Sequence, residues 1–278
     1  MPSCYTGALV GGMILLASQM PGFVDHNQPT PASFSVEKPP VESAPTPADA
    51  PLDVAKADDF EIVLEKSGFD LKTIRQGSEL VPAIYLASLP ADLGALDQVQ
   101  RKKQLFFSAV LPLVLRANEK VARDRTKLIR FRDRFLDGAK LRPGERDWLL
   151  GLADRYGIGD GDAELNDGLF AKLLLRVDEI PVSLALAQAA VESGWGSSRF
   201  ARHGNALFGQ RAWTEKAGIT PKERASGEKH VVRKYESLQG SVVSYVHNLN
   251  THPSYRDFRL RRASLRTAGR ALDGKLLA

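Results

Sequence analysis

The hydrophobic residues in the centre of the chain recur at helical spacing. Between Val99 and Phe135, apolar side chains lie three or four positions apart, and charged residues fill the other positions. The apolar positions are Phe106, Phe107, Val110, Leu111, Val114, Leu115, Val121, Leu128, Phe131 and Phe135. This pattern predicts one long amphipathic helix, which Pro112 should kink or split because proline has no backbone N–H.

Shorter helices are predicted after this long one. They are expected at Glu145–Tyr156, Asp178–Glu192, Gly240–Asn250 and Ala263–Leu277. The second of these is almost wholly apolar, which is typical of a buried helix. Pro181 lies near its start, where a missing N–H costs little, and Gly194 and Gly196 should end it.

One segment has strand character instead. Residues 213–227 resemble turns, and 229–235 contain Val231, Val232 and Tyr235. A small β-hairpin lobe is therefore expected within an otherwise helical protein. The predicted fold class is mainly α (α+β).

The N-terminal part of the chain differs in composition from the rest. Residues 7–20 are apolar, which suits a signal-peptide core but is short for a membrane span of roughly 20 residues. We therefore predict a signal peptide or membrane anchor at 1–24, although no Lys or Arg precedes the run and a frayed apolar N-terminus is the alternative. Seven prolines between Pro29 and Pro51 predict a disordered Pro/Ala-rich linker at 25–58.

The charges of the chain are unevenly distributed. Residues 181–278 contain 16 Lys or Arg against seven Asp or Glu, and six arginines lie between Arg256 and Arg270. Such a balance indicates either an anionic partner or a solvated basic surface. No nucleic-acid-binding motif accompanies the arginines, so attraction to an anionic envelope or simple helix solvation is preferred to nucleic-acid binding.

Metal and thiol chemistry are not expected. The single cysteine, Cys4, cannot form a disulfide within the chain, and the histidines lack metal-ligand spacing. Residues 159–162 read Gly-Asp-Gly-Asp but lack the alternating ligands of a calcium loop. We predict no metal and no cofactor, and the sequence leaves the oligomeric state open.

The candidate chemistry centres on Glu192, at the end of the predicted apolar helix. Burial raises the pKa of a carboxyl group, and a general acid that works near neutral pH needs a raised pKa. Gln188 lies one turn earlier on the same face, and Trp195 offers a flat ring that could stack on a sugar. Taken alone, the spacing is also consistent with Glu192 as an ordinary helix-end residue.

A turn that mixes polar and apolar residues follows the segment around Glu192 and Trp195. Asn205 and Gln210 flank the apolar residues Ala-Leu-Phe and a glycine, and Phe208 is the aromatic among them. Apolar walls with a few polar groups are typical of a ligand-binding groove.

The motif around these residues resembles a known family. Gln-Ala-Ala-Val-Glu-Ser-Gly-Trp-Gly at 188–196, followed by Gly-Asn-Ala-Leu-Phe-Gly-Gln at 204–210, is similar to the glucosaminidase signature of bacterial peptidoglycan hydrolases. The stretch from Val81 to the C-terminus resembles the Bax-type branch, with supporting segments at 81–90, 101–107, 111–118 and 248–255. The flagellar rod-associated hydrolase is a more distant relative.

The resemblance implies a lysozyme-like helical domain that cleaves the β-1,4 bond after N-acetylglucosamine in peptidoglycan glycan strands. It implies a catalytic domain at 141–278, with a helical region at 59–140 packed on it. Glu192 corresponds to the general acid, Tyr255 to a tyrosine that lines the cleft, and Asn205 and Phe208 to the turn beside it. The expected location is the periplasm or cell envelope, by export or by tethering to the inner membrane.

The second carboxylate of such an enzyme would come from the β-lobe. Among Glu215, Glu223 and Glu228 we favour Glu223 as base or stabiliser, with Glu228 next, near the substrate. Two other functions remain open: a peptidoglycan-binding or morphogenesis protein without hydrolytic activity, and a lytic transglycosylase.

Overall fold

A computed structural model describes residues 50–159, 164–222 and 230–278. The predicted signal peptide or anchor at 1–24 and residues 25–49 of the predicted linker lie outside these ranges. Within the described ranges, no helix combines the length and the apolar character needed to cross a bilayer. The division of the chain into domains stays a prediction.

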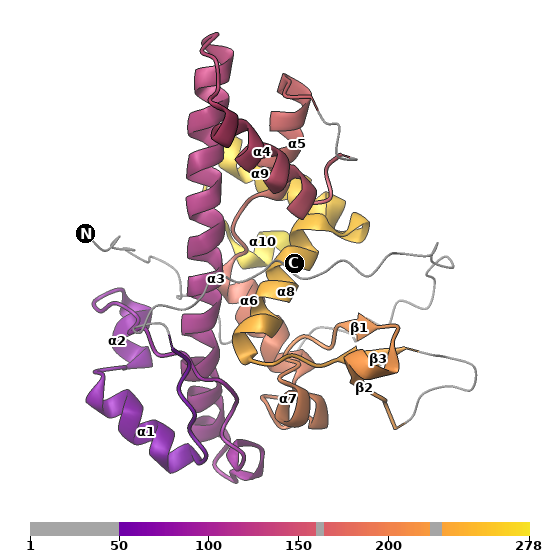
Figure 1. Ribbon diagram of the computed structural model, residues 1–278. Helices are drawn as coiled ribbons and strands as arrows, with labels where there is room; N and C mark the ends of the chain where they lie inside the picture. The colour runs from indigo at the N-terminus through magenta and orange to yellow at the C-terminus, as the bar shows by residue number, and fades with distance from the viewer. Residues whose placement is uncertain (1–49, 160–163, 223–229) are drawn as a thin grey trace.

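Helices make up most of the described structure (Figure 1). In chain order the α-helices are α1 (Ala57–Lys66), α2 (Leu71–Gln76), α3 (Val99–Leu136), α4 (Pro143–Arg155), α5 (Asp167–Arg176), α6 (Val182–Glu192), α7 (Arg199–Gly204), α8 (Leu238–Thr251), α9 (Arg256–Thr267) and α10 (Gly274–Leu277). Short 3-10 turns lie at η2 (Leu93–Ala95), η3 (Glu215–Ala217) and η4 (Pro253–Tyr255).

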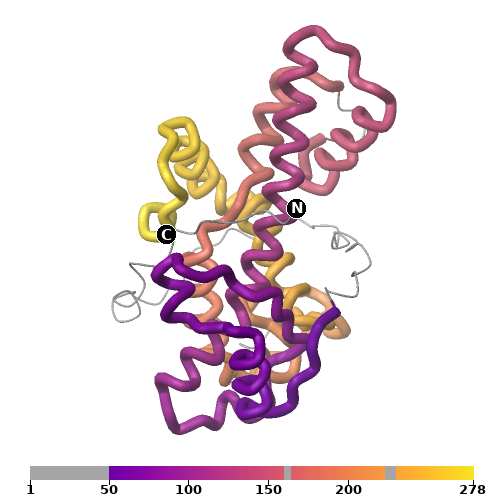
Figure 2. Tube along the Cα trace, turned by 90° about the vertical axis from the view of Figure 1, so that its left-hand side faces the viewer, coloured from indigo at the N-terminus to yellow at the C-terminus, as the bar shows by residue number. Residues whose placement is uncertain are grey.

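The long helix α3 is the spine of the protein. Its 38 residues extend over about 57 Å at 1.5 Å per residue. Figures 1 and 2 show α1 and α2 beside its N-terminal half and α4 and α5 beside its C-terminal half. Helices α5, α6 and α8 pack against the buried face of α3, so the predicted amphipathic helix is confirmed.

Of the two predicted effects of Pro112, a kink or a split of the helix, the split was wrong. The helix continues through Pro112, which is itself buried with Leu111, Leu113 and Val114. Burial of these apolar side chains stabilises a continuous helix by more than the one backbone hydrogen bond that proline removes.

Two predicted helix boundaries were wrong. The buried helix begins at Val182 and not at Asp178, because the side chain of Asn118 holds Ile180 outside the helix. The Asn118 amide donates to the Ile180 carbonyl over 2.7 Å, and the Ile180 N–H donates back over 3.0 Å. The predicted helix at Ala263–Leu277 is two helices, since Gly269 adopts a left-handed φ of 63° between α9 and α10.

A small antiparallel sheet forms the lobe. Its strands β1 (Arg211–Ala212), β2 (Gly218–Ile219) and β3 (Val231–Arg233) lie in the order β1-β3-β2. A Cβ atom at Gly218 would lie 2.2 Å from the carbonyl oxygen of Val232, so the close approach of β2 and β3 requires glycine. The mainly α fold with a small β-lobe is confirmed, and the expected hairpin has a third strand.

The segment before α3 is attached along its length. Leu52 forms a parallel bridge with Leu86, and its N–H donates to the Tyr85 carbonyl over 2.6 Å. On α3, the guanidinium of Arg101 pairs with Glu61 at 2.7 Å and with Asp58. Residues 50–56, at the end of the predicted linker, thus lie against the segment at 85–91.

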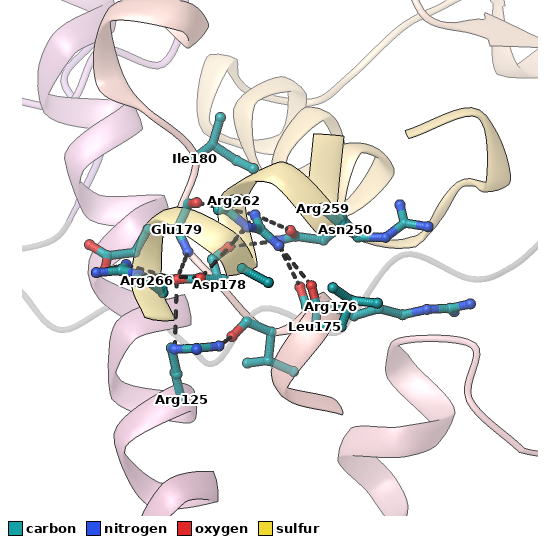
Figure 3. Close-up of polar contacts among 12 residues, drawn as sticks. Arg125, Leu175, Arg176, Asp178, Glu179, Ile180, Asn250, Arg259, Arg262 and Arg266 are labelled. Atoms are coloured by element: carbon teal, nitrogen blue, oxygen red, sulfur yellow. Dashed lines mark hydrogen bonds and ion pairs between the residues drawn. The ribbon is translucent and has the colours of Figure 1, made fainter. Parts of the chain in front are cut away.

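A buried charge cluster joins α3, α9 and the segment between α5 and α6 (Figure 3). Its centre is Asp178, which is 1% exposed. The Asp178 carboxylate pairs with Arg266 at 2.8 Å, with Arg262 at 3.6 Å and with Arg125 at 3.7 Å. Arg262 is fully buried, and burial lowers its pKa to about 10.

Arg262 also donates hydrogen bonds to backbone carbonyls of the segment between α5 and α6. Its guanidinium donates to the carbonyls of Asp178 and Glu179, each over 3.1 Å, and to the side chain of Asn250 over 2.7 Å. One helix turn earlier, Arg259 donates to the carbonyls of Leu249 and His252 at the end of α8. The prediction of a solvated or partner-binding arginine face was therefore wrong for Arg259 and Arg262, because their charges face inward.

This cluster leads to a prediction about stability. Replacing Asp178 with Asn should lower the free energy of unfolding by about 3–5 kcal/mol, because buried guanidinium groups lose their counter-charge. Urea denaturation measures the change. As a matched control, Glu119→Gln removes an exposed pair with Arg123 and should cost less than about 0.5 kcal/mol. Similar losses in both variants would contradict a central role for Asp178.

Candidate functional site

Glu192 is the last residue of α6, and a sharp turn follows it. Gly194, Trp195 and Gly196 have φ angles of 56°, 57° and 78°, all in the left-handed region. The Trp195 N–H donates back to the Ala190 carbonyl over 2.8 Å, which ends the helix. The chain therefore leaves α6 directly beyond the carboxylate of Glu192, which stands at the tip of a rigid helix.

The Glu192 side chain is more exposed than the apolar run around it suggested. It forms no hydrogen bond or ion pair with any residue that the structure describes. Part of its carboxyl group is nevertheless covered, and this partial burial raises the pKa of Glu192. The carboxyl group is thus reachable from solvent and still holds its proton to a higher pH than a free glutamate would.

Gly209 covers part of this carboxyl group. A Cβ atom at Gly209 would lie 3.3 Å from Oε2 of Glu192, and the φ angle of 58° also favours glycine. The turn that carries Gly209 is anchored by buried neighbours: Leu207 is fully buried, and its N–H donates to the hydroxyl of Ser241 on α8. The packing of the turn on α8 therefore sets the position of Gly209 against Glu192.

Two tyrosines lie near this end of α6. Burial raises the pKa of Tyr255, and so does the negative charge of the nearby Glu192. Burial raises the pKa of Tyr245 well above its usual range, and Tyr255 contributes to this shift. Both phenols therefore remain protonated at neutral pH and can donate a hydrogen bond.

Gln188 and Phe208 hold Tyr245 in place. The Tyr245 hydroxyl donates to the side-chain oxygen of Gln188, one turn before Glu192 on α6. The rings of Phe208 and Tyr245 stack with centroids 3.8 Å apart and an angle of 8°. The structure thus brings the predicted site residues Gln188 and Phe208 together around Tyr245, one helix turn before Glu192.

Asn205 and Gln210 tie this turn to its surroundings. Asn205 has a φ of 51° and donates to the carbonyls of Tyr235 and Glu236 over 3.3 Å each. Gln210 accepts a hydrogen bond from the Tyr235 hydroxyl over 2.5 Å and donates to the Ser244 carbonyl over 3.4 Å. Both amides are engaged with the protein itself, and a role for them toward a substrate stays a prediction.

Trp195 packs in another direction. Its ring makes edge contacts with Phe106 and Phe107 of α3, at centroid distances of 5.9 and 5.2 Å. The ammonium of Lys103 lies 4.7 Å above the centre of the ring. The structure places Trp195 against the helical spine, apart from the group around Tyr245, and its predicted contact with sugar stays untested.

The second carboxylate is not located. Glu223 and Glu228 lie outside the described residues, and Glu215, in η3, is exposed on the lobe. In the described part of the chain, no group of three or more His, Cys, Asp or Glu side chains is arranged to hold a metal ion. The assignment of Glu223 as base or stabiliser, with Glu228 next, stays a prediction.

Sequence reasoning missed two contributors to this site. Tyr245 lies within the predicted helix Gly240–Asn250 but was not predicted as a site residue, and Gly209 was not singled out. Tyr245 is 6% exposed, yet its hydroxyl reaches Gln188, 57 positions earlier. A glycine after three apolar residues was the available signal for Gly209, whereas nothing local in the sequence indicates the contact of Tyr245.

Comparison with known proteins agrees with this geometry. Residues 169–275 match the Glucosaminidase family, described as mannosyl-glycoprotein endo-beta-N-acetylglucosaminidase, and this range includes Glu192, the lobe and Tyr255. The chain is also similar to "Protein bax" of Escherichia coli (strain K12), with 35% identity over 182 residues. That match covers 66% of this chain and 62% of the relative's length. No solved structure matches the chain significantly. The chain is therefore similar to the glucosaminidase family over residues 169–275 and to a Bax-type relative over 182 residues.

Proposed function

We propose that this protein is a peptidoglycan hydrolase that cleaves the β-1,4 bond after N-acetylglucosamine. One observation carries the proposal: Glu192, exposed at the tip of α6, has a raised pKa, and it lies within the residues that match the Glucosaminidase family. A glycosidase needs a protonated carboxyl group beside the departing oxygen, and Glu192 meets that need. The substrate is the glycan strand, and the expected location is the cell envelope, reached through the predicted signal peptide or anchor at 1–24.

The mechanism follows from the chemistry of these groups. Glu192 donates its proton to the glycosidic oxygen as the bond to the sugar breaks. Tyr255, a protonated phenol next to Glu192, donates a hydrogen bond that orients the carboxyl group or the sugar. A lobe carboxylate, for which Glu223 is our candidate, activates water or stabilises the positively charged sugar.

Replacing Glu192 with Gln tests the central claim. The amide cannot donate the proton, so cleavage of purified peptidoglycan should stop, while binding to the polymer remains. Mass spectrometry of the released fragments gives the reaction type: a reducing N-acetylglucosamine end indicates hydrolysis, and an anhydro-sugar end indicates a lytic transglycosylase. Full activity of the Gln variant would refute the role of Glu192, and an inactive native protein would leave a binding or morphogenesis role.

The raised pKa of Glu192 predicts a pH dependence of both activity and stability. The protonated form is the acid, so kcat/KM should fall as the pH rises through the raised pKa. A carboxyl pKa that is higher in the folded state contributes stability below its unfolded value, and this contribution is lost as the pH rises through the folded value. Glu192→Gln should therefore melt at a higher temperature than the native protein at pH 7, with no difference below about pH 4.

Replacing Tyr255 should lower the turnover number more than it weakens substrate binding. Tyr255→Phe removes the hydrogen-bond donor beside Glu192 and should lower kcat by about 10²-fold, with little change in KM. The matched control is Tyr156→Phe, because burial also raises the pKa of Tyr156, but this tyrosine lies at the end of α4, beside His247. Equal values of kcat for Tyr255→Phe and the native protein would exclude a catalytic role for this phenol.

A further inference from the structure

The three tryptophans of this protein differ in their surroundings. Trp148 makes an edge contact with Phe131 and carries the ammonium of Lys127 4.2 Å above its ring. Trp195 is covered in the same way by Lys103 and the phenylalanines of α3. Trp213, next to β1, is 63% exposed, and no described cation lies over its ring. Two of the rings therefore stabilise the fold, and the third faces solvent.

Trp213 is also unusual among the exposed side chains. Every other large hydrophobic residue that is exposed in the described ranges is aliphatic: Leu52, Ile62, Leu80, Val99, Leu136, Val191, Leu260 and Leu276. A tryptophan has the largest apolar surface of any side chain, and its exposure to water is correspondingly unfavourable. Flat aromatic faces are a common component of ligand sites, where they pack on apolar faces of the ligand.

The position of Trp213 is defined by the sheet. Ala212 pairs with Val231 across β1 and β3, so Trp213 and His230 are the next neighbours in this register. Their rings meet at a centroid distance of 6.4 Å and an angle of 73°. The sheet order β1-β3-β2 places β1 at an edge. Trp213 is therefore oriented by a cross-strand partner while it stays open to a ligand along the edge of the lobe.

Trp213 is close to the catalytic acid along the chain. Gly209 lies beside the carboxyl group of Glu192, and only three residues separate it from Trp213. Even a fully extended chain places the two Cα atoms within about 14 Å. An oligosaccharide bound at Glu192 can reach that far, whereas a single sugar ring cannot.

The charge of the lobe matches such a ligand. Arg211 and Trp213 are both exposed, and Ala212 between them is half-buried, so the first two share the exposed side of the edge. Residues 211–235 contain seven Lys or Arg against three Asp or Glu. A glycan that carries carboxylates on its substituents is attracted to this combination of a flat ring and a guanidinium.

We propose that Trp213 is a sugar-stacking platform that holds the glycan strand on the β-lobe, with Arg211 beside it for a carboxylate of the same polymer. The proposal rests on the proposed function, since it takes the glycan as the ligand. It assigns the sugar contact to Trp213, on the lobe, and it gives Trp195 a packing role. The platform acts on binding of long substrate and takes no part in proton transfer.

Binding is tested in the inactive Glu192→Gln background, with soluble oligomers of N-acetylglucosamine as the probe. Tryptophan emission should shift to shorter wavelength as the oligomer covers the exposed ring. Trp213→Leu should remove this shift and weaken binding about tenfold, whereas Trp213→Phe, which keeps a flat ring, should retain most of the affinity. The matched control is Leu80→Ala, because Leu80 is 60% exposed and lies before α3; it should bind as the parent does. Circular dichroism of each variant checks the fold.

To separate this proposal from the proposed function, the same substitutions are made in the active protein, and the cleavage of peptidoglycan by each variant is measured. Trp213→Leu should raise KM for the polymer about tenfold with kcat unchanged. Unchanged oligomer affinity in Trp213→Leu, or the absence of any binding by the parent, overturns the platform. If the native protein binds oligomers through Trp213 but cleaves no glycan, the platform stands and the hydrolase assignment fails.

Discussion

The burial of one carboxylate, Asp178, among arginines organises the half of the protein that carries the candidate site. A buried charge is unfavourable unless it is paired, so Asp178 requires Arg262 and Arg266 from α9 and Arg125 from α3 to converge on it. Arg262 in turn fills its other donors with backbone carbonyls of residues 175–179. Helix α9 is thereby fixed to the spine and to the segment that leads into α6.

This constraint reaches the site through two rigid elements. Helix α6 starts four residues after Asp178 and carries Glu192 at its other end, about 15 Å away at 1.5 Å per residue. Helix α9 starts at Arg256, directly after Tyr255, and Arg259 in its first turn binds the last carbonyls of α8. The positions of the acid and of the phenol are therefore set by the same buried cluster, although neither residue contacts it.

The sequence predicts α3 and the end of α6 well, because those signals are local. The apolar spacing between Val99 and Phe135 identifies α3, and the glycines after Glu192 locate the end of α6. The sequence could not indicate that Arg262 faces inward, since its partner Asp178 lies 84 positions earlier and the arginine-rich segment resembles any solvated helix. Nor does the sequence reveal in which direction the ring of Trp195, which lies between two glycines, packs. Trp195 turns toward α3, and Tyr245 reaches the site from α8, a helix for which no site residue was predicted.

The turn after Glu192 shows why Trp195 belongs to the fold. A left-handed φ is unfavourable for any residue with a Cβ atom, and Trp195 adopts one at 57°, between two glycines that adopt it freely. Such strain persists only where the surroundings hold the residue in place. Here the contacts with Phe106, Phe107 and Lys103 do so, and a Cβ atom at Gly196 would lie 2.6 Å from Leu89, so the turn is packed from both sides. The ring that fixes the turn also fixes the direction in which α6 presents its last side chain. For this reason a large aromatic stands in the turn beyond Glu192 even though that aromatic faces the spine.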